Sequence, residues 1–560
     1  MKGFGDVYKS AKKKNKKPKF SQEQIISQAI KLHLKGNILE ATKNYQKLIS
    51  EGCNDHRVFS NYGIILQSLG KLEDAELSTR KAIEIKPNLA EVHLNLGSIL
   101  KGLGKLEDAE LSTRKAIEIK PDYAMSHYNL ANILKGLGKL EDAELSTRKA
   151  IAIKPDYAEA HSNLGSILRD LGKSEEAELS YRKAIEIKPD YAISHYNLGL
   201  ILSEVGKLKE AELSYRKAIK LDPDFARASY SLSLLKYSED RIWQDHLFSE
   251  SFLNKKLPKE QVDIYFARAN ILHKKRNYKE SSKCLKLANN IKLNLNPFKT
   301  DALINKSITL LIESDKKEIN KKEHKNSSEN IFIVGMPRSG STLLESILSM
   351  NNDVYDLGEI NILEEAFLEY KKSKQDVNLA ELYWNKVKKI KGQINITINK
   401  WLYNYHYAGI ICNQIPNAKI IHCFRNPLDN ILSIYRAHFL NGNEYSSSLI
   451  DCAKVYLDQE DVMNKYKTRF RAKIYDLNYD LLVSNPDQEI KSLVSWLGWQ
   501  WNDSYLSPHL NKRTISTASS VQVRSPINSK SIGGWKNYKE MLKPAIEILT
   551  KTNRYQNLIS

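Results

Sequence analysis

A 34-residue period governs the first half of this 560-residue chain. Six glycines keep the interval without a slip, at Gly36, Gly70, Gly104, Gly138, Gly172 and Gly206. Five prolines keep it too, at Pro87, Pro121, Pro155, Pro189 and Pro223. Each unit reads as a helix, a glycine turn, a second helix and a proline stop. Because similar units pack in similar ways, we expect a regular superhelix with a concave face.

The unit resembles the tetratricopeptide repeat (TPR) in its length and in several marked positions. Those positions are Leu96, Gly97, Ala109, Ala116 and Pro121. The period weakens after Pro223, but the stretch 265–291 still reads as one degenerate repeat, with Asn277 at the turn. The resemblance therefore implies an all-α TPR superhelix over residues 21–295.

One histidine recurs in each of four repeats, at His93, His127, His161 and His195, and Phe59 occupies the same register. Neighbouring histidines would lie about a helix pair apart, too far to share a metal ion at a ligand distance of about 2 Å. A phenylalanine in the same register also indicates packing. We therefore favour packing between helices over a metal site, and expect no metal.

An asparagine ladder lies two residues further on, at Asn61, Asn95, Asn129, Asn163 and Asn197. Asparagine is a poor residue for a helix interior, so five in register require a reason. The row resembles the ladder in the TPR groove of O-linked N-acetylglucosamine transferase, where the amides hold a peptide backbone. The resemblance implies that Asn95, Asn129, Asn163 and Asn197 bind a protein or peptide acceptor. The alternative is that repeat duplication copied an indifferent residue.

A candidate anion site follows the repeats. The apolar run 331–334 predicts a buried strand, Gly335 and Gly340 bound a turn, and 341–349 has helical spacing. Such a turn directs backbone N–H groups and the positive end of a helix dipole to one spot. The Walker A lysine position holds Ser341, which argues against an ATPase or a P-loop kinase.

Further strands are predicted at 419–425 and 472–479, and further helices at 428–440 and 487–497. Strands that alternate with helices favour a mostly parallel sheet, and ligands then bind at the carboxyl ends of the strands. We predict an α/β P-loop-like domain over 330–560, joined to the repeats by a linker over 296–329.

The loop and the motifs over roughly 330–550 resemble tyrosylprotein sulfotransferases and their bacterial TPR-linked relatives. These enzymes use 3′-phosphoadenosine-5′-phosphosulfate (PAPS) as the sulfuryl donor. The resemblance implies a 5′-phosphosulfate loop made of Arg338, Ser339, Gly340, Ser341 and Thr342. It implies a 3′-phosphate site at Arg425 and Ser433. Tyr479 takes the position that contacts adenine in the family; it would otherwise be a core residue at a strand end.

The same resemblance implies the catalytic residues. Glu359, in a Gly-Glu pair, takes the place of the general base that accepts the acceptor's proton. Arg338, Lys400 and Ser519 take the places of groups that stabilise the leaving phosphate. The Asp and Pro that flank the family's lysine are absent around Lys400. The stretch 529–536 resembles the lid over the nucleotide, with Lys530 and Lys536 as its basic residues.

Composition adds few constraints. The net charge of +20 favours anionic partners, but the basic residues are spread along the chain, and nucleic acid is not expected. The five cysteines are far apart and fit a reducing, cytoplasmic location. No apolar run reaches the roughly 18 residues of a membrane span. The lysine-rich residues 1–20 predict a disordered basic tail.

The sequence thus favours a PAPS-dependent sulfotransferase that modifies a hydroxyl, expected to belong to a protein or peptide held by the TPR groove. The alternative is a TPR scaffold whose C-terminal domain binds a nucleotide but has lost catalysis. The departures around Lys400 favour the scaffold, whereas Glu359, Arg425 and Ser433 favour the enzyme.

Overall fold

The computed structural model describes residues 21–235, 240–254, 256–315, 328–373, 377–390, 395–439, 442–511, 513–515, 517 and 519–558. The chain divides into two compact units, residues 1–189 and 190–560. The predicted basic tail over 1–20 lies outside the described residues, as do residues 316–327 of the predicted linker.

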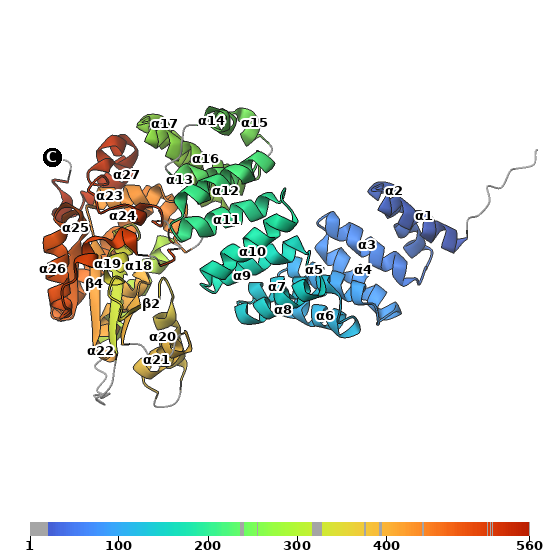
Figure 1. Ribbon diagram of the computed structural model, residues 1–560, viewed down its shortest axis with the longest axis horizontal. Coiled ribbons are helices and arrows are strands. Elements are labelled where there is room, and N and C mark those ends of the chain that lie inside the picture. Colours follow the sequence, from blue (N-terminus) through green and yellow to red (C-terminus); the bar gives the residue numbers. More distant parts are fainter. Residues whose placement is uncertain are drawn as a thin grey trace, which may run out of the picture. The chain divides into compact units, whose positions relative to one another are not determined.

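The first unit consists of helix pairs that stack in chain order (Figure 1). Its helices are α1 (Gln22–Leu34), α2 (Ile38–Ser50), α3 (His56–Ser68), α4 (Leu72–Ile85), α5 (Ala90–Gly102), α6 (Leu106–Ile119), α7 (Ala124–Gly136), α8 (Leu140–Ile153), α9 (Ala158–Asp170) and α10 (Ser174–Ile187). The periodic glycines lie in the turn inside each pair with φ near +75°, for example +75° at Gly104. Side chains with a Cβ rarely adopt this conformation, which explains the glycine period.

The histidine ladder connects successive repeats. The Nε2 atoms of His93, His127 and His161 each donate to the carbonyl oxygen of the proline six residues earlier, over 2.8, 2.8 and 3.0 Å. The ring therefore fastens a helix to the proline that ended the preceding pair. The packing interpretation is confirmed for these three residues.

The second unit begins with the remaining helices of the array. These are α11 (Ala192–Glu204), α12 (Leu208–Leu221), α13 (Ala226–Leu234), α14 (Arg241–Phe248), α15 (Glu250–Leu253), α16 (Pro258–Lys274) and α17 (Tyr278–Leu295). The degenerate repeat is α16 with α17, and Asn277 caps α17 by accepting the Glu280 N–H. The predicted turn position of Asn277 is confirmed.

The predicted linker contains a helix, α18 (Thr300–Asp315), that packs against the α/β domain. Leu310 lies in the core of that domain, and Ser307 Oγ donates to the carboxylate of Asp458 over 2.6 Å. Residues 300–315 are therefore an ordered part of the second unit. The predicted domain boundaries themselves stay predictions.

A five-stranded parallel sheet forms the centre of the second unit, in the order β2-β3-β1-β4-β5. The strands are β1 (Glu329–Gly335), β2 (Val354–Asp356), β3 (Ile396–Asn399), β4 (Ala418–Phe424) and β5 (Ile474–Asn478). The predicted strands correspond to β1, β4 and β5. The sequence did not indicate β2 and β3, which are only three and four residues long.

Helices cover both faces of the sheet, because alternate residues of each strand point to opposite faces. Phe332 and Val334 pack with the helices of one face, whereas Ile331 and Ile333 pack with those of the other. The helices of this part are α19 (Ser341–Leu348), α20 (Ile362–Lys372), α21 (Leu379–Ile390), α22 (Ala408–Gln414), α23 (Pro427–Tyr435), α24 (Leu449–Arg469), α25 (Tyr479–Ser484), α26 (Pro486–Leu497) and α27 (Lys539–Leu549). The predicted helices 341–349, 428–440 and 487–497 correspond to α19, a shorter α23, and α26.

The last array helices and the α/β domain share one apolar core. Phe266 of α16 and Leu285 of α17 belong to the same buried cluster as Leu428 of α23 and Leu542 of α27. Asn289 also donates from its amide to a carbonyl oxygen of α23 over 3.0 Å. The predicted architecture, a TPR-like all-α array followed by an α/β parallel-sheet domain, is confirmed. Within the part of the chain that the structure describes, every helix is too short or too polar to span a bilayer.

Candidate functional site

The candidate site lies at the carboxyl edge of the sheet, where a parallel sheet collects its strand ends. Each of the five strands ends beside a predicted site residue. These are Arg338 after β1, Glu359 after β2, Lys400 after β3, Arg425 after β4 and Tyr479 after β5. The fold therefore gathers residues that are up to 141 positions apart in the sequence.

The loop between β1 and α19 has the shape of an anion cradle. A Cβ at Gly335 would lie 2.3 Å from the carbonyl oxygen of Cys423, so only glycine permits this approach of β1 to β4. Arg338 adopts φ +67°, an uncommon conformation for a residue with a side chain. Gly340 (φ +95°) then caps α19, whose first N–H groups have no partner inside the helix. These backbone donors point toward the loop.

Arg338 is held by three side chains at its guanidinium. Its Nε donates to Ser433 Oγ over 3.2 Å, Nη1 donates to Ser519 Oγ over 2.5 Å, and Nη2 donates to Gln522 Oε1 over 2.8 Å. The structure thus brings Ser433 and Ser519, predicted for different parts of the site, to one cation. In this structure Ser433 contacts Arg338, not Arg425.

Arg425 is buried at the end of β4 and incompletely paired. Its Nη2 donates to the carbonyl oxygen of Ser531 over 2.9 Å, but its buried Nε has no hydrogen-bond partner among the described residues. Burial and, as the next largest cause, the nearby charge of Arg425 together lower the pKa of Arg338 to about 10. Two guanidinium groups that repel each other form a site that an anion would stabilise.

Tyr479 closes the other side of the loop. The Arg425 guanidinium lies 4.6 Å from the centre of its ring, and a Cβ at Gly340 would meet Tyr479 Cδ2 at 2.2 Å. The Tyr479 hydroxyl is 3.0 Å from Ser531 Oγ, in the predicted lid. Asp429 anchors the lid by accepting the backbone N–H groups of Gly533 and Trp535 over 2.7 and 2.9 Å. Tyr479 is therefore a site residue by position.

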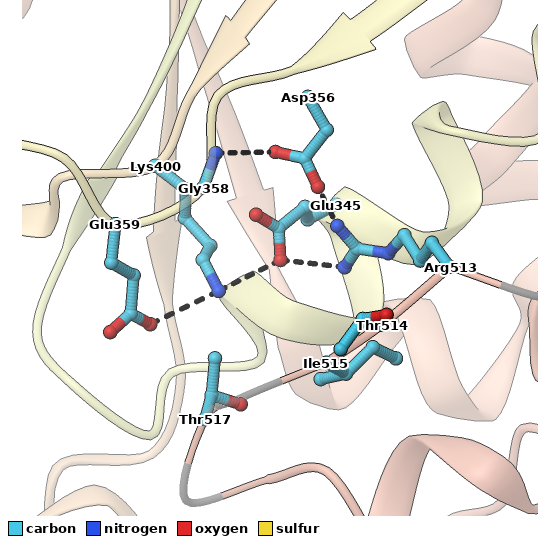
Figure 2. Close-up of a pocket in the computed structure, with 9 residues that line it drawn as sticks. All are labelled: Glu345, Asp356, Gly358, Glu359, Lys400, Arg513, Thr514, Ile515 and Thr517. Atoms are coloured by element: carbon cyan, nitrogen blue, oxygen red, sulfur yellow. Dashed lines mark hydrogen bonds and ion pairs between the residues drawn. The ribbon is translucent and has the colours of Figure 1, made fainter. Parts of the chain in front are cut away.

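Lys400 and Glu359 form an ion pair beside the loop (Figure 2). Lys400 Nζ lies 3.1 Å from Glu359 Oε1, 2.7 Å from Glu345 Oε2 and 3.4 Å from Thr342 Oγ1. The Lys400 side chain is 1% exposed, whereas that of Glu359 is 48% exposed and accessible to an acceptor. Burial alone would lower the pKa of Lys400, but Glu345 and Glu359 outweigh it and raise that pKa above its usual range.

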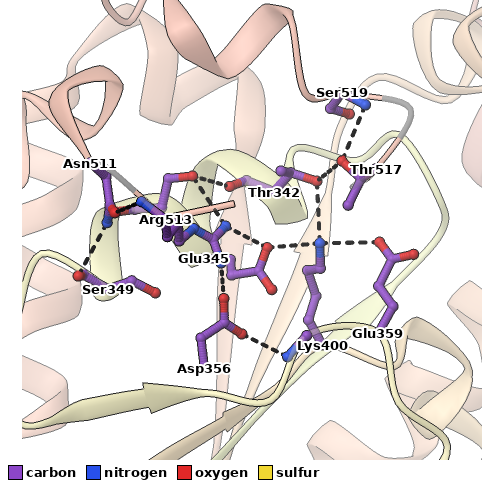
Figure 3. A network of polar contacts seen from close by, with 12 residues as sticks. Thr342, Glu345, Ser349, Asp356, Glu359, Lys400, Asn511, Arg513, Thr517 and Ser519 are labelled. Atoms are coloured by element: carbon purple, nitrogen blue, oxygen red, sulfur yellow. Dashed lines mark hydrogen bonds and ion pairs between the residues drawn. The ribbon is translucent and has the colours of Figure 1, made fainter. Parts of the chain in front are cut away.

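Arg513 is a second cation, besides Lys400, that pairs with the buried carboxylate of Glu345 (Figure 3). Arg513 donates from Nη2 to Glu345 Oε2 over 2.6 Å, and its Nη1 pairs with Asp356. Glu345 thus lies between Lys400 and Arg513, with its side chain only 2% exposed. These residues line a cavity of about 80 Å³ next to Glu359. The network keeps Lys400 charged and beside the phosphate loop.

The structure also places residues to which sequence reasoning gave no role of their own, although Ser531 lies in the predicted lid: Glu345, Asp356, Asp429, Arg513, Thr517, Gln522 and Ser531. Thr517 Oγ1 lies 3.3 Å from Thr342 Oγ1, so Thr517 also contacts the phosphate loop. One of these had a signal in the sequence. Glu345 is a charged residue on an otherwise apolar helix, one turn after the loop.

For the other predicted site residues, the contacts in the structure do not define a role. Lys530 and Lys536 are exposed in and beside the lid. Ser339 is buried, and its hydroxyl has no hydrogen-bond partner among the described residues. The ladder residues Asn95, Asn129, Asn163 and Asn197 are half-buried on the first helix of successive repeats. Their roles stay predictions.

Comparison with known proteins agrees with this division of the chain. Residues 330–503 match the model of the sulfotransferase family. Tetratricopeptide-repeat models match 56–89, 90–123, 113–144, 165–206, 192–225 and 262–294. The chain therefore carries tetratricopeptide repeats followed by a sulfotransferase-family domain.

Two relatives are similar to parts of this chain. A protein of Aquifex aeolicus (strain VF5), of uncharacterised function, is 30% identical over 329 residues, which cover 54% of this chain and 43% of the relative. A protein of Caenorhabditis briggsae named "Putative protein-tyrosine sulfotransferase" is 24% identical over 242 residues, 38% of this chain and 81% of the relative. The chain thus spans less than half the length of the Aquifex relative.

Two of the similar solved structures cover about a third of this chain. The TPR protein YrrB is 24% identical and covers 33% of this chain and 95% of its own, with a TM-score of 0.28. The pilus biogenesis factor PilW is 18% identical and covers 38% of this chain and 97% of its own, with a TM-score of 0.35.

Proposed function

We propose that the α/β domain transfers a sulfuryl group from PAPS to a hydroxyl group of a protein or peptide acceptor. The observation that carries this proposal is the convergence of an anion loop, two repelling arginines and an accessible Glu–Lys pair at one sheet edge. PAPS carries two anionic groups on its ribose, a 5′-phosphosulfate and a 3′-phosphate, and the two neighbouring cations Arg338 and Arg425 can serve one each.

The residues present fit such a donor. Ser339 Oγ and Arg425 Nε are buried polar atoms without a hydrogen-bond partner among the described residues, although Arg425 Nε lies 3.9 Å from the carboxylate of Asp480, and a bound anion would give both a hydrogen-bond acceptor. PAPS supplies an activated sulfuryl group whose leaving group is a phosphate. In this proposal the loop residues Arg338 to Thr342 hold the phosphosulfate end, Arg425 and Ser433 hold the 3′-phosphate, and Tyr479 lies against the base.

The ion pair of Glu359 and Lys400 indicates how the acceptor hydroxyl is deprotonated in this proposal. The Glu359 carboxylate, oriented by Lys400 over 3.1 Å, accepts the proton of the acceptor hydroxyl. Lys400, beside Thr342 of the loop, and Arg338, held by Ser519, stabilise negative charge on the departing phosphate. No step requires a metal ion.

A protein or peptide acceptor is supported by the array. Four half-buried asparagines in register offer one amide per repeat, which matches the even spacing of peptide groups. The name of the C. briggsae relative supports the same class of acceptor. Small alcohols have no groups that would use an extended row of amides.

The donor is tested by calorimetry with 3′-phosphoadenosine-5′-phosphate and with ATP, in the absence of Mg²⁺. We expect tight binding of the first and much weaker binding of ATP; equal affinity would overturn the donor assignment. Incubation with sulfur-labelled PAPS and a cell lysate then tests transfer, and we expect label in protein. Tight nucleotide binding with no transfer to any acceptor would favour the catalytically inactive scaffold.

The acceptor class is tested with one variant that carries Asn95→Ala, Asn129→Ala, Asn163→Ala and Asn197→Ala. We expect a steep rise in KM for the protein acceptor that the lysate experiment identifies, while transfer to a small phenol is unchanged. Normal modification of that protein acceptor by the variant would make the ladder a relic of duplication.

A further inference from the structure

The segment 511–524 brings several side chains to the site from outside the sheet. Arg513 pairs with Glu345, Thr517 contacts Thr342, and Ser519 and Gln522 both accept from Arg338. The described residues of the segment (511, 513–515, 517 and 519–524) contain one short 3₁₀ turn, at 522–524, and belong to no strand or long helix. Its position must therefore be fixed by contacts with other parts of the chain.

Some of those contacts come from α19 and the core of the α/β domain, and others come from a helix of the array. The carbonyl oxygen of Glu204, the last residue of α11, accepts the Ile515 N–H over 3.0 Å and Arg524 Nη2 over 2.7 Å. The last carbonyls of a helix have no partner inside the helix and carry the negative end of its dipole. A backbone N–H and a guanidinium are the donors that such an end attracts.

Arg524 also closes the segment on itself. Its Nη1 donates to the carbonyl oxygen of Asn511 over 2.5 Å, and its Nη2 donates to that of Arg513 over 2.6 Å. One side chain thus joins both ends of the segment to the C-terminus of α11. Since Arg524 and Glu204 lie in the same compact unit, this is a contact within one body.

The contact is particular to one repeat. Six turn glycines share the left-handed conformation, but an added Cβ at Gly36, Gly70, Gly104, Gly138 or Gly172 would have no atom within 4 Å. At Gly206 the same Cβ would lie 3.0 Å from Arg524 Nε. Among these six turns, only that between α11 and α12 supports the segment.

We propose that Arg524 is a positioning residue of the sulfuryl-transfer site, and that the turn between α11 and α12 is part of the active-site scaffold. The proposal rests on the proposed function. Arg524 touches neither donor nor acceptor. It acts by holding Ser519 and Gln522 on Arg338, and Arg513 on the carboxylate that pairs with Lys400.

The first test compares Arg524→Ala and Arg524→Lys in the full chain. The alanine variant loses three hydrogen bonds from a charged donor, and we expect kcat to fall about 10- to 100-fold. The Kd for 3′-phosphoadenosine-5′-phosphate should change by no more than about threefold, since the loop and Arg425 remain. The lysine variant should recover part of kcat, because one ammonium can reach some of the three carbonyls.

The second test uses two matched glycine variants. Gly206→Ala and Gly172→Ala carry the same left-handed backbone strain, but only the first would press on Arg524. We expect equal losses of thermal stability, a several-fold lower kcat for Gly206→Ala alone, and a wild-type kcat for Gly172→Ala. Equal kcat in the two glycine variants would overturn the proposal.

Hydrogen exchange separates this proposal from the proposed function. Backbone amides of 513–523 should exchange faster in Arg524→Ala and in Gly206→Ala, whereas those of β1 and β4 should not change. If the wild-type chain transfers no sulfuryl group, the proposed function fails and exchange alone decides whether the segment is held. Unchanged exchange in both variants, or unchanged kcat in Arg524→Ala, would overturn the positioning role.

Discussion

The helical array and the sheet edge are built in opposite ways. In the array each residue has counterparts 34 positions away, and a ladder histidine makes the same contact in three successive repeats. At the sheet edge every residue occurs once, and its partners come from distant parts of the chain, as Arg338 and Gln522 do. The array is redundant and local, whereas the site is unique and non-local. A single substitution should therefore matter little in the array and greatly in the site.

The boundary between the local, repeated contacts of the array and the unique, non-local contacts of the site does not coincide with the end of the repeats. Helices α11 to α17 belong to the array by sequence but to the second compact unit by packing. His273 of α16 and Ser281 of α17 both bond the Tyr538 hydroxyl, over 2.9 and 3.0 Å. The last repeats should therefore respond to substitution as the site does.

The strongest test of the unique region is Glu359→Gln. Removal of one general base should lower transfer about 10²- to 10⁴-fold, while nucleotide binding stays nearly unchanged. The measurement is a single-turnover assay with labelled PAPS. A matched control is Glu365→Gln, since Glu365 is an exposed carboxylate six residues along the chain. Wild-type turnover in Glu359→Gln would place the base elsewhere.

Arg425→Ala should have the next largest effect, on donor affinity. Loss of a buried, charged hydrogen-bond donor to phosphate should cost about 1.5–3 kcal/mol of binding free energy, measured by calorimetry. The exposed Arg471 provides the control, as Arg471→Ala removes the same charge without touching the site. Undiminished affinity in Arg425→Ala would show that the 3′-phosphate binds somewhere else.

The pH dependence of folding stability that arises from His273 also tests the contrast between the array and the site. Burial, with Arg436 and Lys274 nearby, lowers the pKa of His273 to about 3, so the ring stays neutral in the folded chain. In the unfolded chain His273 binds a proton below about pH 6.5, whereas in the folded chain it does not until the pH nears 3. The contribution of His273 to the free energy of unfolding is therefore complete above about pH 6.5 and is lost as the pH falls toward 3. Between pH 7 and 5.5 the loss should be about 1 kcal/mol.

The free energy of unfolding of the second unit is measured by denaturant titration at both pH values. In His273→Phe the decrease over this range should be smaller by that amount, although the variant also loses the hydrogen bonds to Tyr538 and Arg436 at every pH. Parallel pH dependence in the two proteins would contradict the prediction.

The smallest effect is expected in the redundant region. Asn129→Ala removes one amide of the ladder and should raise KM for a protein acceptor about 2- to 12-fold, the equivalent of about 0.5–1.5 kcal/mol. Neither kcat nor transfer to a small phenol should change. A larger effect from this one residue than from the other three together would show that the ladder is not redundant.

Sequence reasoning succeeded where the signal was repeated or compact. The glycine period predicted the array, and the 331–348 stretch predicted β1, the loop and α19. It failed for β2 and β3, which have only three and four residues, and for α18, which lay in an expected linker. These elements are stabilised by neighbours in the sheet or core, and that information lies outside their own sequence.

The site was predicted in part for the same reason. Each residue near a motif, such as Glu359 or Arg425, could be named in advance. The partners that fix those residues could not: Arg513 lies 168 positions from Glu345 on a segment without periodicity. Arg524 was equally invisible, since its significance depends on three backbone carbonyls that no pattern of side chains marks.

Because α11 supports the site, the positions in the array at which repeats can be gained or lost in evolution are restricted. Repeats multiply by duplication of whole 34-residue units, and near-identical units recombine easily. A unit gained or lost before residue 190 would leave the Glu204–Arg524 contact and the core around α16 and α17 as they are. A gain or loss between α11 and α17 would shift the register of that support. We expect lineages to vary the length of the array at its N-terminal side, where a change leaves the support of the site in place.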